Sequence, residues 1–151
     1  ENFKVIFAGL VYEQAYYEKL KSEISKSGLS KKIEFKGFVD KKEKHKLFKK
    51  SDLFVLLSED SKKGFEGFGL VYLEALSYGL PTIVSSQCGF SEINFKNSTG
   101  IVVNPRDYKK ISKFIYSITK KDISKISNRC IAIASKKDWK YKRKEIEKLY
   151  K

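Results

Sequence analysis

The sequence predicts an α/β fold, namely a Rossmann-like parallel sheet with helices on both faces and a helical C-terminal end. Short apolar runs alternate five times with segments of helical periodicity along the chain. The apolar runs are strand-sized and nearly continuous, as in parallel strands that are covered on both faces. After residue 107 only helical patterns follow.

The length of 151 residues fits one compact domain, which we expect to span residues 1–151. Hydrophobic residues make up 41% of the chain and charged residues 33%, a composition typical of a folded globular protein. No apolar run approaches the roughly 20 residues that a membrane-spanning helix needs.

The first half contains three expected strands and two expected helices. An apolar run closed by Gly9 predicts a buried strand, and apolar or aromatic residues at helical spacing predict a helix that stops at Gly28. Asp40 followed by Glu43 is a helix-start signature. The expected elements are a strand at 3–9, a helix at 12–27, a strand at 32–37, a helix from Asp40, and a central strand at 53–57.

The second half begins with a polar loop at 58–65 and a glycine-bearing turn, and then becomes apolar again. Gly79 ends the first helix of this half, and a β-branched run follows it. The expected elements are a helix at 70–78, a strand at 81–85, a short helix near Ser91, a strand at 100–103, and helices at 107–119, 123–135 and 139–150.

The segment 66–81 carries the strongest chemical signal. Gly67 and Gly69 allow close approach of the backbone to a ligand just before a helix begins. The first N–H groups of that helix, near Leu70 and Val71, lack partners within the helix. Together with the helix dipole they favour an anion such as a diphosphate. A simple structural turn is the alternative explanation.

Two glutamates flank this helix end. Glu74 lies about 6 Å further along the helix axis than Leu70, where its carboxylate can accept hydrogen bonds from two neighbouring ribose hydroxyls. Glu66, before the helix, can do the same for a second sugar. A glutamate that merely complements the helix dipole is the alternative.

The two glutamates are separated by seven residues in E-G-F-G-L-V-Y-L-E-A-L-S-Y-G-L-P. This segment resembles the E-x7-E signature of glycosyltransferase family 4 and its relatives of the two-domain GT-B fold. The resemblance extends over nearly the whole chain, through residues 33–39, 51–58, 81–86, 89–92 and 98–105. It implies that the chain is the C-terminal, donor-binding half of such an enzyme.

The resemblance also implies a role for each residue that matches the motif. Glu66 is expected to act at the reacting sugar, as the catalytic residue, and Glu74 to bind the ribose hydroxyls. The other expected donor-binding residues are Gly67, Phe68 and Gly69 along the sugar, Leu70 and Val71 at the phosphates, and Phe38 and Val39 at the nucleobase.

Enzymes of this kind transfer a sugar from a nucleotide-diphosphate sugar to an acceptor with retention of anomeric configuration. They need no bound metal or other cofactor, and the absence of an Asp-x-Asp triplet agrees with that. Relatives carry a further strand and helix, and an acceptor-binding domain, ahead of the part matched here. We therefore expect a chain truncated at its N-terminus that is inactive by itself.

The loop at 59–65 is longer than in typical relatives and contains Lys62 and Lys63. We hypothesise that one of these lysines reaches the donor phosphates. A solvated loop remains the alternative.

The net charge of +14 fits a lysine-rich surface, because only three of the 32 cationic side chains are arginines. Nucleic-acid binders usually rely on arginine, so we expect no nucleic acid as partner. The two cysteines lack metal-ligand spacing, which favours free thiols in a reducing, cytoplasmic compartment. The positive charge also allows peripheral attachment to an anionic membrane surface on the cytoplasmic side. The alternative function is a non-enzymatic, basic Rossmann-like module that binds nucleic acid or an anionic membrane.

Overall fold

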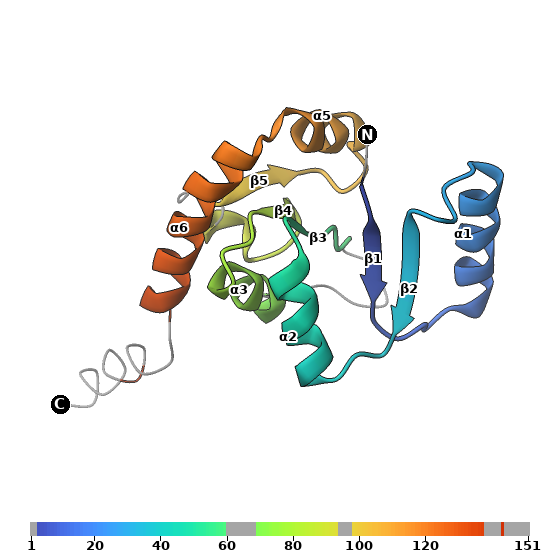
Figure 1. Ribbon diagram of the computed structural model, residues 1–151, viewed down its shortest axis with the longest axis horizontal. Helices are drawn as coiled ribbons and strands as arrows, with labels where there is room; N and C mark the ends of the chain where they lie inside the picture. The colour runs from blue at the N-terminus through green and yellow to red at the C-terminus, as the bar shows by residue number, and fades with distance from the viewer. Residues whose placement is uncertain (1–2, 60–68, 94–97, 138–142, 144–151) are drawn as a thin grey trace. The chain divides into compact units, whose positions relative to one another are not determined.

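The computed structural model describes residues 3–59, 69–93, 98–137 and 143. Two compact units make up the chain, Glu1–Leu47 and Phe48–Lys151, and each is described by itself. The strands within each unit run parallel, and successive strands are joined through helices (Figure 1). This architecture confirms the expected Rossmann-like α/β class.

The first unit contains strands β1 (Val5–Ala8) and β2 (Ile33–Gly37), joined by helix α1 (Gln14–Lys26). The two strands pair in parallel, with Val5 opposite Ile33. The ring of Phe7 stacks on that of Phe35 at 5.0 Å, and Tyr17 of α1 meets Phe35 edge-on at 5.1 Å. These aromatic contacts pack α1 onto one face of the two strands.

The prediction that the first strand is buried is wrong. All four residues of β1 are exposed, and Val5, Ile6 and Phe7 retain 38%, 37% and 44% of their accessible surface. Among the residues that the structure describes, β1 pairs with β2 alone, so its other edge is open. Helix α1 has no buried residue and therefore covers the strand only in part.

Helix α2 (Lys41–Lys50) begins where the sequence predicts. The Asp40 carboxylate accepts a hydrogen bond from the backbone N–H of Glu43 at 2.7 Å, which satisfies one of the free donors of the first turn. Phe48, near the end of the helix, already belongs to the second unit and is buried within it against Phe54 and Tyr78.

The second unit is built on β3 (Phe54–Leu56), β4 (Thr82–Ser85) and β5 (Gly100–Val103), paired in that order. All four residues of β4 are buried. The prediction of a central strand at 53–57 is wrong for the described sheet, because β3 lies at its edge and leaves Val55 42% exposed. Within the described residues, the strands form a two-stranded and a three-stranded sheet.

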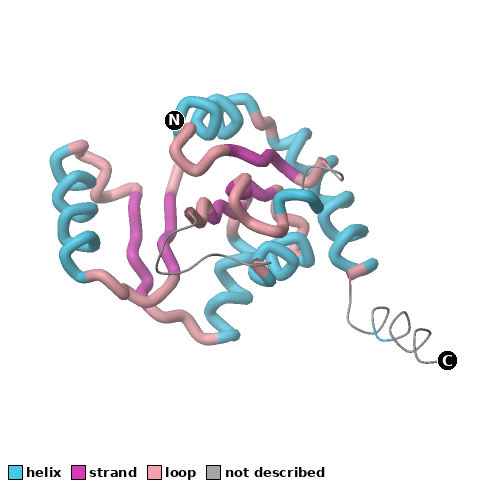
Figure 2. The backbone as a smooth tube through the Cα atoms, turned by 180° about the vertical axis from the view of Figure 1, so that it is seen from behind, coloured by secondary structure: helices cyan, strands magenta, loops and turns pink. Residues whose placement is uncertain are grey.

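The longer helices of the second unit are α3 (Leu70–Ser77), α5 (Tyr108–Ser117) and α6 (Lys120–Lys136), drawn in cyan in Figure 2. Helix α6 begins three residues earlier than expected, because Thr119 and Asp122 form a reciprocal capping box. Residues 91–93 form the expected short helix. The helix expected at 139–150 lies outside the described residues except for Arg143.

The core of the second unit gathers apolar side chains from the sheet, α3, α6 and the segment after β4. Both cysteines are free and buried in this core, and burial raises the pKa of the Cys130 thiol to about 12. None of the described helices is long and apolar enough to cross a membrane. The buried cluster consists of Tyr72, Leu76, Val84, Cys88, Phe90 and Cys130.

Candidate functional site

The turn into α3 is built on a left-handed glycine. Gly69 has φ 73° and ψ 61°, a conformation that costs a residue with a side chain about 1–2 kcal/mol. Its carbonyl oxygen accepts a hydrogen bond from the N–H of Tyr72 at 2.9 Å, which closes the first turn of the helix. Gly69 therefore shapes this turn, and this geometry is compatible both with the expected close approach of a ligand and with the alternative of a simple structural turn.

Leu70 and Val71 form the first turn of α3, as predicted. The side chain of Leu70 is 71% exposed, and Val71 is half-buried. No described residue accepts a hydrogen bond from the backbone N–H of either residue. These amides and the positive end of the helix dipole contribute positive potential at the start of the helix.

Glu74 lies one turn further along α3, with its side chain exposed. The opposite side of the helix is fixed in the core, because Tyr72, Ala75 and Leu76 are fully buried. Periodicity thus places the carboxylate on the solvent side, within about one helical turn of the Leu70 and Val71 amides. The predicted order of phosphate-binding amides followed by a diol-binding carboxylate is compatible with this arrangement.

Several predicted site residues lie outside the described residues. They include the catalytic candidate, two residues expected along the sugar, and both candidate lysines. These residues are Glu66, Gly67, Phe68, Lys62 and Lys63.

The residues expected at the nucleobase belong to the first unit and follow the carboxyl end of β2. Gly37 takes φ 65°, and the side chain of Phe38 beyond it is 72% exposed, whereas Val39 is half-buried. A hollow of about 390 Å³ opens at the ends of β1 and β2. Its walls are mainly apolar and aromatic, formed by residues 7–13, Tyr16, Tyr17, Leu20, Phe35 and Gly37.

The structure adds an ion pair that the sequence does not predict. Arg106, after β5, donates hydrogen bonds to both carboxylate oxygens of Glu59, after β3, with the shortest at 2.9 Å. These hydrogen bonds hold the pKa of Glu59 below its usual range and raise the pKa of Arg106. Because β4 lies between β3 and β5, the pair links two loops at the carboxyl edge of the sheet.

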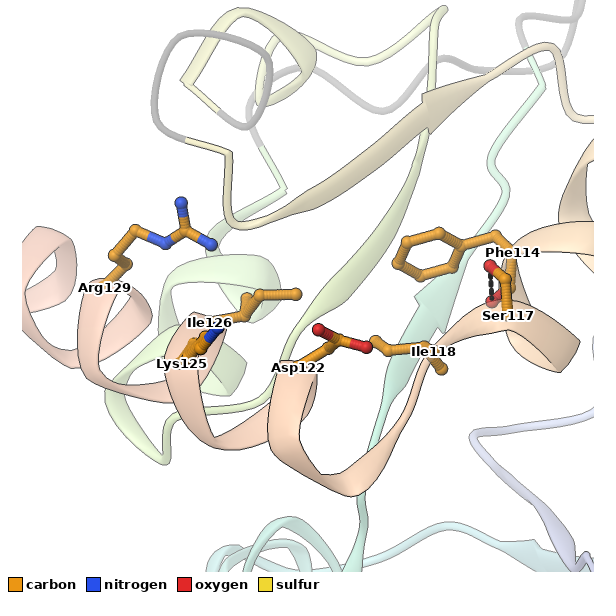
Figure 3. Close-up of a pocket in the computed structure, with 7 residues that line it drawn as sticks. All are labelled: Phe114, Ser117, Ile118, Asp122, Lys125, Ile126 and Arg129. Atoms are coloured by element: carbon orange, nitrogen blue, oxygen red, sulfur yellow. Dashed lines mark hydrogen bonds between the residues drawn. The ribbon is translucent and has the colours of Figure 1, made fainter.

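A second, shallow hollow of about 240 Å³ lies between α5 and α6 (Figure 3). Phe114, Ile118 and Ile126 give it an apolar side, and Arg129 lines one end of it. The carboxylate of Asp122 in this hollow already accepts hydrogen bonds from the backbone and hydroxyl of Thr119, which lower its pKa. None of the residues predicted to bind a donor lines this hollow.

Within the described parts of the chain, no three His, Cys, Asp or Glu side chains gather closely enough to hold a metal ion.

Comparison with known proteins assigns the chain to a family. Residues 1–137 match the family model described as glycosyl transferases group 1. An uncharacterized glycosyltransferase of Methanocaldococcus jannaschii, MJ1607, is 36% identical over 106 residues, which cover 70% of this chain and 25% of that protein.

Solved structures agree in fold. HepE from Anabaena, in complex with UDP, superposes with a TM-score of 0.82 at 25% identity over 98% of this chain and 41% of that chain. The C-terminal domain of the group 1 glycosyl transferase LpcC from Francisella tularensis superposes with a TM-score of 0.71 at 25% identity, over 82% of this chain and 62% of that one. The chain spans about a quarter of MJ1607 and about two fifths of HepE. It therefore belongs to the glycosyl transferases of group 1 and has the fold of the C-terminal domain of a GT-B glycosyltransferase.

Proposed function

We propose that this chain is the donor-binding domain of a retaining glycosyltransferase of family 4. The enzyme transfers a hexose-type sugar from a nucleotide-diphosphate sugar to an acceptor in glycan, glycolipid or polysaccharide synthesis. The observation that carries the proposal is the start of α3, where the Leu70 and Val71 amides have no described acceptor and Glu74 is exposed one turn away. An anionic diphosphate next to a ribose diol matches that order of groups.

In this proposal the two glutamates have separate tasks. Glu74 accepts hydrogen bonds from the ribose hydroxyls, and Glu66 acts at the donor sugar close to the reacting carbon. The amides of Leu70 and Val71 stabilise the phosphate charge as the leaving group departs, so no metal is required. The remaining contacts are the main chain of Gly67, Phe68 and Gly69 to the sugar, and the backbone of Phe38 and Val39 to the nucleobase.

The names of similar proteins support the class of donor. HepE has been solved in complex with UDP-glucose. A relative from Xanthomonas oryzae, 25% identical over 143 residues, is named a GDP-mannose-dependent mannosyltransferase. These donors share a nucleoside diphosphate and a hexose but differ in base and sugar, so the shared chemistry is the part we assign to this chain.

Lys62 and Lys63 are proposed as additional phosphate contacts. Replacing both with glutamine in the full polypeptide should weaken binding of a nucleoside diphosphate but not of the corresponding nucleoside. Unchanged diphosphate affinity in a calorimetric titration would assign the two lysines to a solvated loop.

The proposed working enzyme is a longer polypeptide with an acceptor-binding domain, and residues 1–151 alone are inactive. This chain covers 25% of MJ1607 and 41% of HepE, so both of these proteins are much longer than the part that it matches. Strand β1 supports further chain contacts, because it exposes apolar side chains and hydrogen-bonds to β2 alone within the described part. Such an apolar strand is typical of a sheet interior, not of an exposed edge.

We further propose a cytoplasmic enzyme that works at the membrane surface. The net charge of +14 favours attraction to anionic lipid headgroups. Two relatives are named after lipid-linked acceptors, a phosphatidyl-myo-inositol mannosyltransferase and a mannosyltransferase that uses cellobiosyl-diphosphopolyprenol.

A panel titration of the full polypeptide tests the proposed function. UDP-, GDP- and ADP-linked hexoses are titrated by calorimetry, with a DNA duplex and single-stranded RNA as competing ligands. The proposal expects saturable binding of at least one sugar nucleotide. Steeply salt-dependent binding of nucleic acid, without sugar-nucleotide binding, would favour the basic-module alternative.

A further inference from the structure

Tyr72 connects the start of α3 to the rest of the second unit. It is fully buried, although it belongs to the first turn of a helix that begins at an exposed residue. Its backbone N–H closes that turn on the Gly69 carbonyl at 2.9 Å. Any restraint on the Tyr72 side chain is therefore transmitted directly to the turn that carries the Leu70 and Val71 amides.

The Tyr72 side chain contacts strand β3 and the segment that follows β4. Its hydroxyl donates a hydrogen bond to the carbonyl oxygen of Leu56, the last residue of β3. Its ring meets Phe54 of β3 edge-on at 5.6 Å and stacks on Phe90, after β4, at 5.0 Å and 10°. The rings fill the core, while the hydroxyl is the part that fixes the helix relative to the carboxyl end of a strand.

We propose that Tyr72 is a positioning residue for the donor diphosphate. The hydrogen bond to Leu56 fixes the height of the first helical turn above the sheet edge, and thereby fixes where the Leu70 and Val71 amides point. Because an amide–phosphate hydrogen bond weakens steeply with misalignment, a small shift of this turn lowers phosphate affinity. This inference rests on the proposed function of the α3 start.

The test is Tyr72→Phe in the full polypeptide, which keeps the ring contacts and removes the hydroxyl. Two probes are compared. One is the nucleoside diphosphate among UDP, GDP and ADP that binds best to the unmodified protein, and the other is the corresponding nucleoside. We expect the affinity for the diphosphate to fall about fivefold, the effect of one ordinary hydrogen bond, and the affinity for the nucleoside to stay within about twofold. A merely structural role would weaken binding of both probes alike, or of neither.

Ile83→Val is the matched control, because Ile83 is fully buried in the neighbouring strand β4 and has no predicted part in the site. It should lower the melting temperature without changing the ratio of diphosphate to nucleoside affinity. An equal change of that ratio in both variants would overturn the proposal for Tyr72.

Glu74→Gln separates this inference from the proposed function. If Glu74→Gln weakens nucleotide binding while Tyr72→Phe leaves the affinity ratio unchanged, only the positioning role fails. If no nucleoside diphosphate binds to the unmodified protein, the proposed function itself fails, and the positioning role fails with it.

Discussion

Gly100→Ala should strongly destabilise the second unit. Gly100 opens β5 opposite Thr82 of β4, with φ 152°. A Cβ atom there would lie 1.9 Å from the Thr82 carbonyl oxygen and 2.7 Å from its nitrogen. These are backbone atoms of a fully buried residue, so no side chain can move aside. Backbone strain costs about 1–3 kcal/mol and overpacking about 1–3 kcal/mol more, so we expect a loss of about 4 kcal/mol.

The assay is urea unfolding of the full polypeptide, followed by circular dichroism, with Gly28→Ala as the matched control. Gly28 also has a positive φ, 68°, but a Cβ atom there would meet no other atom within 4 Å. The control should therefore show dihedral strain alone, about 1–2 kcal/mol. A Gly100→Ala variant no less stable than Gly28→Ala would refute the close pairing of β4 and β5.

Three further predictions concern the site. Glu74→Gln should weaken nucleotide binding by about 1–3 kcal/mol in calorimetry, because a charged acceptor of ribose hydrogen bonds is lost. Glu66→Ala should lower turnover more than nucleotide affinity, and equal effects at both glutamates would contradict their separate roles. The hydrogen bonds from Arg106 lower the pKa of Glu59 in the folded state below its ordinary value of 4.5. The pair therefore stabilises the fold fully above pH 4.5, and this stabilisation is lost as the pH falls through the folded-state pKa of Glu59. Arg106→Gln should make the free energy of unfolding, measured in urea, less sensitive to acid pH. The same dependence on pH in the variant and the unmodified protein would show that the pair contributes nothing to stability.

The sequence predicts the site of α3 well because the signals there are local. Gly69 and Gly79 bracket the helix, so that its start at Leu70 and its end at Ser77 lie close to the expected bounds of 70–78. Each of these properties depends on residues within about two turns of one another, which is the range over which helical periodicity and capping act.

The burial of β1 could not be predicted, because burial depends on what else pairs with a strand. The apolar run at 3–9 is typical of an interior strand, yet Val5 and Phe7 are exposed in the described structure. An apolar composition indicates that a strand is suited to burial, but it does not identify the strand or helix that would bury it.

The link between Glu59 and Arg106 is likewise invisible in the sequence, since 47 residues separate them. Only the strand order, with β4 between β3 and β5, brings their loops together. The early start of α6 is a different case. Thr119 and Asp122 have the spacing of a capping box, a local signal that was available in the sequence.

Residue-resolved NMR during a nucleotide titration tests the central claim most directly. Added to the full polypeptide, the nucleoside diphosphate that binds best should shift the amide resonances of Leu70 and Val71 strongly, and its nucleoside should shift them far less. Saturable diphosphate binding that leaves both amides unperturbed would contradict the assignment of the α3 start as the phosphate site.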